Sequence, residues 1–281
     1  MLFLTLFLTV FLSADLSCYE SIFLETEDGW KIYLKYVKPK KENLPLLLLI
    51  HSQKENHLEW KKWFEFIESF GYGWAAIDLR GHGLSIYKTD GSSQTYKSFS
   101  VSGNDNDYNK MIRDIDTAVV YLSSAGIKED KIFIIGSNLG ANVSAKFCVI
   151  NRVIAGLVLI NPYSIINDIP IIGLLRNYGP RPLLIVSSEN NIKRIRDTLL
   201  MYYLAKSKTK QNGTFLIING NFTSPKEISK SLIYRILHWI NTPYLFDVID
   251  ISSSTLSISI SSQTEVSTQP LKNSYLIIEA E

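Results

Sequence analysis

The sequence predicts an α/β protein with a doubly wound, mostly parallel sheet. Short, uninterrupted apolar runs recur along the chain, as expected of parallel strands that are covered on both faces. These runs are residues 46–50, 74–78, 132–135, 154–160, 183–186 and 215–218. Segments with helical periodicity separate most of the runs. Strands that alternate with helices in this way build a parallel sheet with helices on both faces.

The remaining elements follow from local patterns. Residues 22–37 are predicted to form two strands around the turn Glu27-Asp28-Gly29, because apolar and polar positions alternate there. The polar residues 86–109 are expected to form a surface loop. The predicted helices are residues 60–70, 108–124, 141–149, 195–206 and 228–240. Ligands of such sheets sit at the carboxyl ends of the strands, so a site is expected in the loops that follow the buried runs.

Composition and charge exclude several classes of protein. The 281 residues, with 46% hydrophobic and 20% charged side chains, suit one large globular domain and exclude wholesale disorder. The net charge of +2, without a long basic run, gives no reason to expect a nucleic-acid partner. No histidine pair or Cys-x-x-Cys has metal-ligand spacing and no nucleotide motif is present, so we expect no metal and no cofactor.

The two ends of the chain differ from the middle. Residues 1–17 hold an apolar run of signal-peptide length followed by small residues, which predicts an exported protein (periplasmic, secreted or on the outer surface). A hydrophobic strand or membrane anchor is the alternative, and Asp15 disfavours lipid attachment at Cys18. Residues 18–242 form the predicted α/β domain. Residues 243–281 are expected to form a small β-rich extension, with a partly ordered tail as the alternative.

One stretch has the pattern of a nucleophile elbow, the strand–turn–helix that presents a catalytic serine between two glycines. The apolar run 132–135 leads into Gly136-Ser137-Asn138-Leu139-Gly140, and a helix-compatible segment follows at once. The serine position holds Asn138. The central residue of such a turn has positive φ, which asparagine adopts more readily than most residues. Gly136 and Gly140 permit close packing of the strand against the helix.

Five segments together resemble α/β-hydrolases, specifically the bacterial esterase/lipase and serine-aminopeptidase-like branch. They are Thr26-Glu27-Asp28-Gly29, the run ending at His51, Asp78-Leu79-Arg80-Gly81-His82-Gly83-Leu84-Ser85, the elbow with Leu139-Gly140-Ala141-Asn142, and Arg181-Pro182-Leu183-Leu184. The resemblance covers about residues 26–240 and implies an α/β-hydrolase type of sheet. It also implies hydrolysis of esters or peptides by a Ser, an Asp and a His, in that chain order.

Asparagine stands at all three positions that the resemblance implies for this triad. Asn138 takes the nucleophile position, and Asn221 takes the histidine position in the turn after the run 215–218. The acid position, after the run 183–186, is Asn191, with the adjacent Asn190 as an alternative. A carboxamide supplies neither a nucleophile nor a base.

Neighbouring residues offer weak substitutes. Ser137 lies next to the position that the turn exposes, and Glu189 could replace the acid but has no histidine to orient. The oxyanion hole would use the N–H of Leu139 and that of Ser52 or Gln53, and Ser52 stands where the family has glycine or another small residue.

These residues favour a non-catalytic binding or structural module over an enzyme. Its partner would be an unidentified small molecule or protein, and membrane association through the N-terminus is possible. The alternative is an active carboxylic-ester or peptide hydrolase with a non-standard catalytic set.

Overall fold

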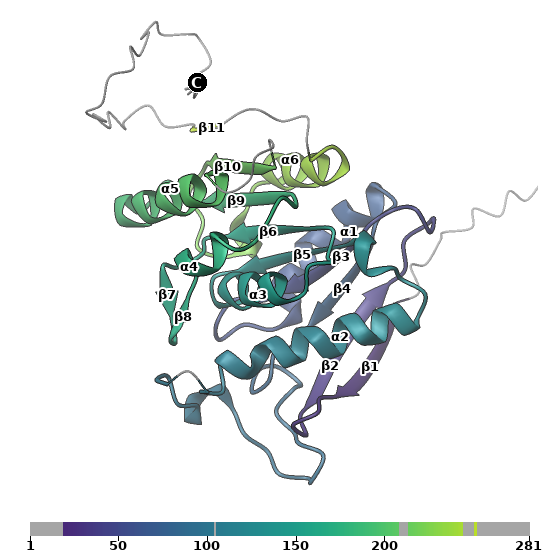
Figure 1. Ribbon diagram of the computed structural model, residues 1–281. Helices are drawn as coiled ribbons and strands as arrows, with labels where there is room; N and C mark the ends of the chain where they lie inside the picture. Colours follow the sequence, from purple (N-terminus) through teal and green to yellow (C-terminus); the bar gives the residue numbers. More distant parts are fainter. Residues whose placement is uncertain (1–18, 104, 208–212, 244–249, 252–281) are drawn as a thin grey trace, which may run out of the picture.

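A computed structural model describes residues 19–103, 105–207, 213–243 and 250–251. Within them, one nine-stranded sheet has the order β1-β2-β4-β3-β5-β6-β9-β10-β11 (Figure 1). The pairs β1–β2 and β2–β4 are antiparallel, and every other pair in this sheet is parallel. The mostly parallel sheet that the sequence predicts is therefore confirmed.

The elements alternate along the chain as the apolar runs indicate. The strands are β1 (Glu20–Glu25), β2 (Lys31–Val37), β3 (Leu46–Ile50), β4 (Gly73–Ile77), β5 (Ile132–Ser137), β6 (Gly156–Ile160), β7 (Ile165–Ile166), β8 (Ile169–Pro170), β9 (Leu183–Ser187), β10 (Thr214–Ile218) and β11 (Asp250–Ile251). The α-helices are α1 (Lys61–Ser69), α2 (Ile112–Ser124), α3 (Leu139–Ile150), α4 (Ile172–Leu175), α5 (Ile192–Lys206) and α6 (Lys230–Asn241).

Two layers of helices cover the sheet and divide its apolar side chains between two cores. Alternate residues of a strand point to opposite faces. In β3, accordingly, Leu46, Leu48 and Ile50 pack into the core that contains α2, α3 and α5. Leu47 and Leu49 pack into the core that contains α1 and α6. All five residues of β3 are buried, which explains why this strand has no polar alternation.

A small hairpin, β7–β8, follows β6 and has no counterpart among the predicted elements. Its two-residue turn is Asn167-Asp168, whose φ angles are 48° and 59°. Two successive positive φ values are typical of the type I′ turn that joins tight hairpins, and Asn and Asp accept them more readily than most residues. Backbone oxygens of this turn accept hydrogen bonds from Asn106 and Asn109, so the hairpin is attached to the long loop before α2.

The predictions for the chain ends fall mostly outside the described residues. Residues 1–17 and Cys18 lie wholly outside them, and of residues 243–281 only 243 and 250–251 are described. Asp250 and Ile251 form β11, which pairs in parallel with Ile217 and Ile218 of β10. Among the described helices, none is long and apolar enough to cross a bilayer.

Candidate functional site

The elbow between β5 and α3 has the backbone geometry that the glycine pattern predicts. Asn138 has φ 50° and ψ −113° and directly precedes the first residue of α3. A Cβ placed on Gly136 would overlap the carbonyl oxygen of Gly140. A Cβ on Gly140 would lie 2.5 Å from the carbonyl oxygens of both Ile50 and His51. Neither glycine can therefore carry a side chain without moving the backbone around it.

The side chain of Asn138 connects three loops at the carboxyl edge of the sheet. Its Nδ2 donates to Ser52 Oγ at 3.0 Å, in the loop after β3, and to the carbonyl oxygen of Thr223 at 3.1 Å, in the loop after β10. Ser52 Oγ donates in turn to Ser137 Oγ at 2.9 Å. The amide of Asn138 is thus an internal cross-link, and Ser137 is one of the groups that it fixes.

A second amide pair joins the loops after β9 and β10. Asn190 Nδ2 donates to Asn221 Oδ1 at 2.7 Å, and both residues are exposed. Asn191 has a different role, since its Oδ1 accepts the N–H of Arg194 at 3.1 Å and caps the first turn of α5. Glu189 Oε1 accepts the N–H of Gly220 at 2.7 Å. The structure therefore brings Asn190, and not Asn191, against Asn221.

The loop after β3 uses one of the predicted oxyanion donors internally. The N–H of Ser52 donates to Glu59 Oε2 at 2.7 Å, and Glu59 Oε1 accepts the hydroxyl of Ser224 at 2.9 Å. Glu59 lies in the 3₁₀ turn His57–Trp60 and is fully buried. Burial raises the pKa of its carboxyl group, although the hydrogen bonds from Ser52 oppose that shift. The N–H of Ser52 is consequently not available to a substrate oxygen.

The other two predicted donors are still available. Within the described part of the chain, the N–H groups of Gln53 and Leu139 donate to no protein acceptor. Leu139 is the first residue of α3, and the first N–H groups of a helix have no partner inside it.

Glu59 and Ser224 were not predicted from the sequence, because no local pattern marks a single glutamate ahead of Trp60 as buried.

A family model described as serine aminopeptidase, S33, matches residues 41–196, more than half of the chain. The chain belongs to this hydrolase family. The matched segment begins before β3 and ends within α5, so it includes the loop after β3, the elbow and the loop after β9. Among curated proteins, no sequence matches the chain.

Solved structures confirm the α/β-hydrolase fold. An α/β hydrolase from Penicillium sp. sh18 has a TM-score of 0.63 at 13% identity, covering 82% of this chain and 100% of that one. An esterase from Pyrococcus furiosus has a TM-score of 0.60 at 16% identity, covering 79% and 92% of the two chains. An esterase from Exiguobacterium antarcticum has a TM-score of 0.59 at 12% identity, covering 79% and 100%. At identities this low, the structural likeness shows a shared fold and no more.

In this member of the serine aminopeptidase family, the histidines have hydrogen-bond partners away from the elbow. His51 Nε2 accepts the N–H of Leu79 at 2.9 Å, which leaves the ring proton on Nδ1 to donate to Ser52 O at 2.7 Å. His57 Nδ1 lies 2.8 Å from Asp78 Oδ1. Among the described residues, no hydrogen bond joins a histidine to Asn138 or to Ser137.

His82 is buried against aromatic and imidazole rings. Its Nδ1 donates to the carbonyl oxygen of Arg80 at 2.9 Å, and its ring stacks on Tyr96 with 4.5 Å between centroids. Its Nε2 has no hydrogen-bond partner within the described chain. Burial, followed by the nearby ring of His51, lowers the pKa of His82 to about 3. The fourth histidine, His238, is exposed in the last turn of α6.

The Asp-x-Arg-Gly-His-Gly segment of the family also carries a buried carboxylate. Asp78 Oδ1 accepts the N–H of His57 at 2.6 Å, and Oδ2 accepts the N–H of Leu84 at 2.8 Å. A Cβ on Gly83, whose φ is 50°, would overlap Asp78 Oδ2. Burial alone would raise the pKa of Asp78, but its hydrogen bonds and the adjacent histidines hold it below the usual range. This carboxylate organises a turn.

Arg80 makes the second buried polar cluster of that segment. Its guanidinium lies between Asp28, at 2.6 Å, and Asp114, at 2.7 Å, and Arg80 and Asp114 are fully buried. These pairs tie the β1–β2 turn to α2. Asp78 and Arg80 of this segment thus hold neighbouring loops in place.

Proposed function

We propose that this protein is a non-catalytic α/β hydrolase, a binding or structural module on a serine-hydrolase scaffold. The observation that carries the proposal is the pair of hydrogen bonds from Asn138 Nδ2 to Ser52 Oγ and to Thr223 O. A catalytic serine at this position would need a base within hydrogen-bond reach. The amide here links loops, and it has neither a hydroxyl to attack with nor a histidine bonded to it.

The acid and histidine loops support the same proposal. Asn190 and Asn221 bond to each other as amide donor and amide acceptor. We infer that Asn190 takes the acid position and Asn221 the histidine position. Neither amide accepts a proton near neutral pH, so the pair cannot act as a base. In well-studied triads, loss of the serine or the histidine alone lowers kcat by about 10⁶.

The test is labelling of the purified full chain with a serine-directed fluorophosphonate, read out by intact mass. We expect no adduct and no turnover of p-nitrophenyl esters above the rate without protein. The S137A variant is the matched control, because it removes the hydroxyl nearest to the elbow position. An adduct on the wild type that disappears in S137A would overturn the proposal.

A second candidate function is hydrolysis by a non-standard catalytic set. The free N–H groups of Gln53 and Leu139 favour it, because two such donors can stabilise an oxyanion. Residual acceleration of about 10³–10⁴ over water is known for oxyanion holes and binding without a working triad. Ester turnover that is unchanged in S137A would support this second candidate.

Export through residues 1–17 is the expected setting of either function. The length of the apolar run and the small residues after it support this location. N-terminal sequencing of the protein expressed with its full leader tests it, and an intact Met1 in protein recovered from the cytosol would contradict it.

A further inference from the structure

One face of α5 combines apolar and basic side chains that the rest of the described chain leaves uncovered. Ile192, Leu200 and Tyr203 are 58%, 47% and 42% exposed. Lys193 and Arg196 are exposed on the same helix. With 3.6 residues per turn, these five positions fall within an arc of about 100°. They therefore form one continuous strip, which we call the α5 strip.

The opposite face of α5 anchors the helix to the protein. Ile195, Met201 and Tyr202 are buried in the core between the helix and the sheet. In addition, Arg194 donates to the hydroxyl of Tyr163 at 2.9 Å and lies over its ring. The helix is thus fixed to the protein. The α5 strip lies on the opposite side of the helix from these contacts, so it points away from the core.

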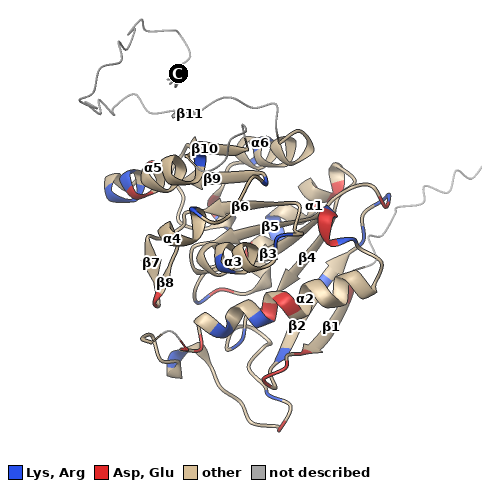
Figure 2. Cartoon of the chain, in the orientation of Figure 1, with Lys and Arg blue, Asp and Glu red and all other residues tan. Residues whose placement is uncertain are grey.

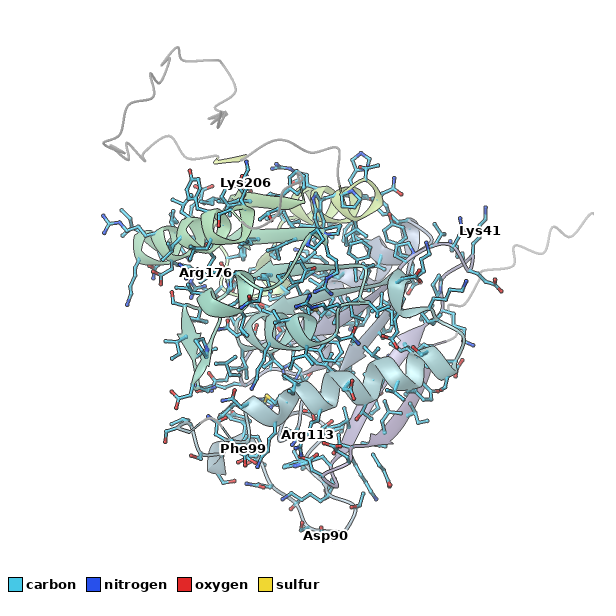
Figure 3. The ribbon with its side chains drawn as sticks, viewed as in Figure 1. Lys41, Asp90, Phe99, Arg113, Arg176 and Lys206 are labelled. Carbon is cyan, nitrogen blue, oxygen red and sulfur yellow. The ribbon has the colours of Figure 1, made fainter. Side chains whose placement is uncertain are left out.

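The charged residues of α5 are mostly basic. Its sequence, IKRIRDTLLMYYLAK, holds four basic residues and one acidic residue, Asp197, which is half-buried. Lys193, Arg194 and Arg196 lie in the first two turns of the helix, and Figure 2 shows this end of α5 largely blue. The exposed Arg176 directly follows the neighbouring helix α4, and α5 itself ends at Lys206 (Figure 3). The excess of basic residues therefore favours a partner that carries negative charge.

We propose that the α5 strip docks on the surface of an anionic lipid membrane. Ile192, Leu200 and Tyr203 would enter the boundary between headgroups and acyl chains, while Lys193 and Arg196 pair with lipid phosphates. Exposed apolar side chains that stand beside basic ones can bind at a bilayer surface through buried apolar area and attraction to anionic lipids.

The interleaving of apolar and basic side chains favours this partner over a nucleic acid. A nucleic acid would be matched by basic groups and stacking rings, and exposed Ile and Leu would add nothing. A bilayer surface offers phosphates and an apolar interior within one side-chain length of each other. The inference needs no catalytic group, so it holds whether or not the proposed loss of catalysis is correct.

The experiment is sedimentation of the full chain with extruded vesicles. One set contains phosphatidylcholine alone, and the other contains equal parts of phosphatidylcholine and phosphatidylglycerol. We expect stronger binding to the anionic vesicles than to the neutral ones, and weaker binding as salt is added. The double variant I192E/L200E should reduce partitioning more than about tenfold, because it removes two apolar contacts. K193Q and R196Q should each reduce it about fivefold.

Matched controls separate this helix from the rest of the molecule. V120E places the same charge at an apolar position of α2 that is 61% exposed, and K61Q removes an exposed lysine of α1. Both should bind vesicles like the wild type, and every variant keeps residues 1–18. Equal binding of I192E/L200E and the wild type would overturn the proposal. So would binding to soluble polyglutamate or DNA without binding to vesicles, or no vesicle binding at all.

Discussion

Asn190 Nδ2 lies 2.7 Å from Asn221 Oδ1, so two exposed amides join the loops that follow β9 and β10. An acid and a histidine would bond in this way if these positions carried a triad. The side chains of Asn190 and Asn221 contact each other as an acid and a histidine would, but both carry an amide. The capacity of these positions to support catalysis is therefore open to experiment.

Restoring three side chains should restore hydrolysis. We expect N138S/N190D/N221H to hydrolyse p-nitrophenyl acetate at least about 10² times faster than the wild type, because the elbow backbone and two oxyanion donors are already in place. Steady-state kinetics with ester and intact-mass labelling with a fluorophosphonate both measure the gain.

A matched triple variant tests which asparagine holds the acid position. N138S/N191D/N221H carries the same residue types, and an aspartate at position 191 still suits the N-cap of α5. This variant should stay near the wild-type rate, since residue 191 is bonded to Arg194 and not to residue 221. Equal rates for the two triple variants would contradict the placement of Asn190.

Truncating Asn138 should destabilise the fold. N138A loses the bonds to Ser52 and Thr223 and places alanine at φ 50°, and together these should lower the free energy of unfolding by about 2–3 kcal/mol. N138G loses the same bonds but tolerates the φ angle, so its loss should be about 1 kcal/mol smaller. Urea denaturation measures both. A variant N138A as stable as the wild type would show that the amide cross-link contributes nothing.

Because of Glu59, the free energy of unfolding should depend on pH above the range in which ordinary carboxyl groups titrate. Burial raises its pKa in the folded state above 4.5, so the folded protein holds a proton that the unfolded chain releases. Stability from this proton is fully present below about pH 4.5 and is lost as pH rises through the raised pKa. E59Q keeps the shape and removes the titration, so its stability relative to the wild type should increase with pH. E42Q, at an exposed glutamate, should leave the profile unchanged.

His82 should make the protein sensitive to acid. Its folded-state pKa is about 3, against 6.5 when exposed. As pH falls from about 6.5 toward 3, the unfolded chain binds a proton that the folded protein refuses, so stability decreases by at most about 1.4 kcal/mol per pH unit. H82Q should flatten this slope in urea denaturation, whereas H238Q, at an exposed position, should not. An unchanged slope in H82Q would contradict the buried, neutral state of the ring.

Most of the fold follows from patterns that act locally. A run such as Leu46–Ile50 has no polar position, and only a strand covered on both faces accommodates it. The hairpin β7–β8 escaped prediction because two-residue strands carry no periodicity, although Asn167-Asp168 between isoleucines is a turn signal.

The site was less accessible to sequence reasoning. Asn190 and Asn191 are adjacent and identical, so only the direction in which the loop leaves β9 decides which of them meets Asn221. The bond from Ser52 to Glu59 depends on how a 3₁₀ turn packs against the neighbouring loops. Residue spacing contains no information about either contact.

The crowding at Gly136 and Gly140 separates what the fold requires of the sequence from what a reaction would require. A side chain at Gly140 would collide with the carbonyl oxygens of Ile50 and His51 whatever residue stands at position 138. Substitutions at these glycines are therefore penalised at the level of folding, whereas position 138 requires only a residue that adopts positive φ and bonds to the neighbouring loops. A sequence search that weights the glycines will therefore group chains by this fold, whatever residue stands at position 138. The central residue of the elbow, at position 138, is the better marker for the presence of a catalytic serine.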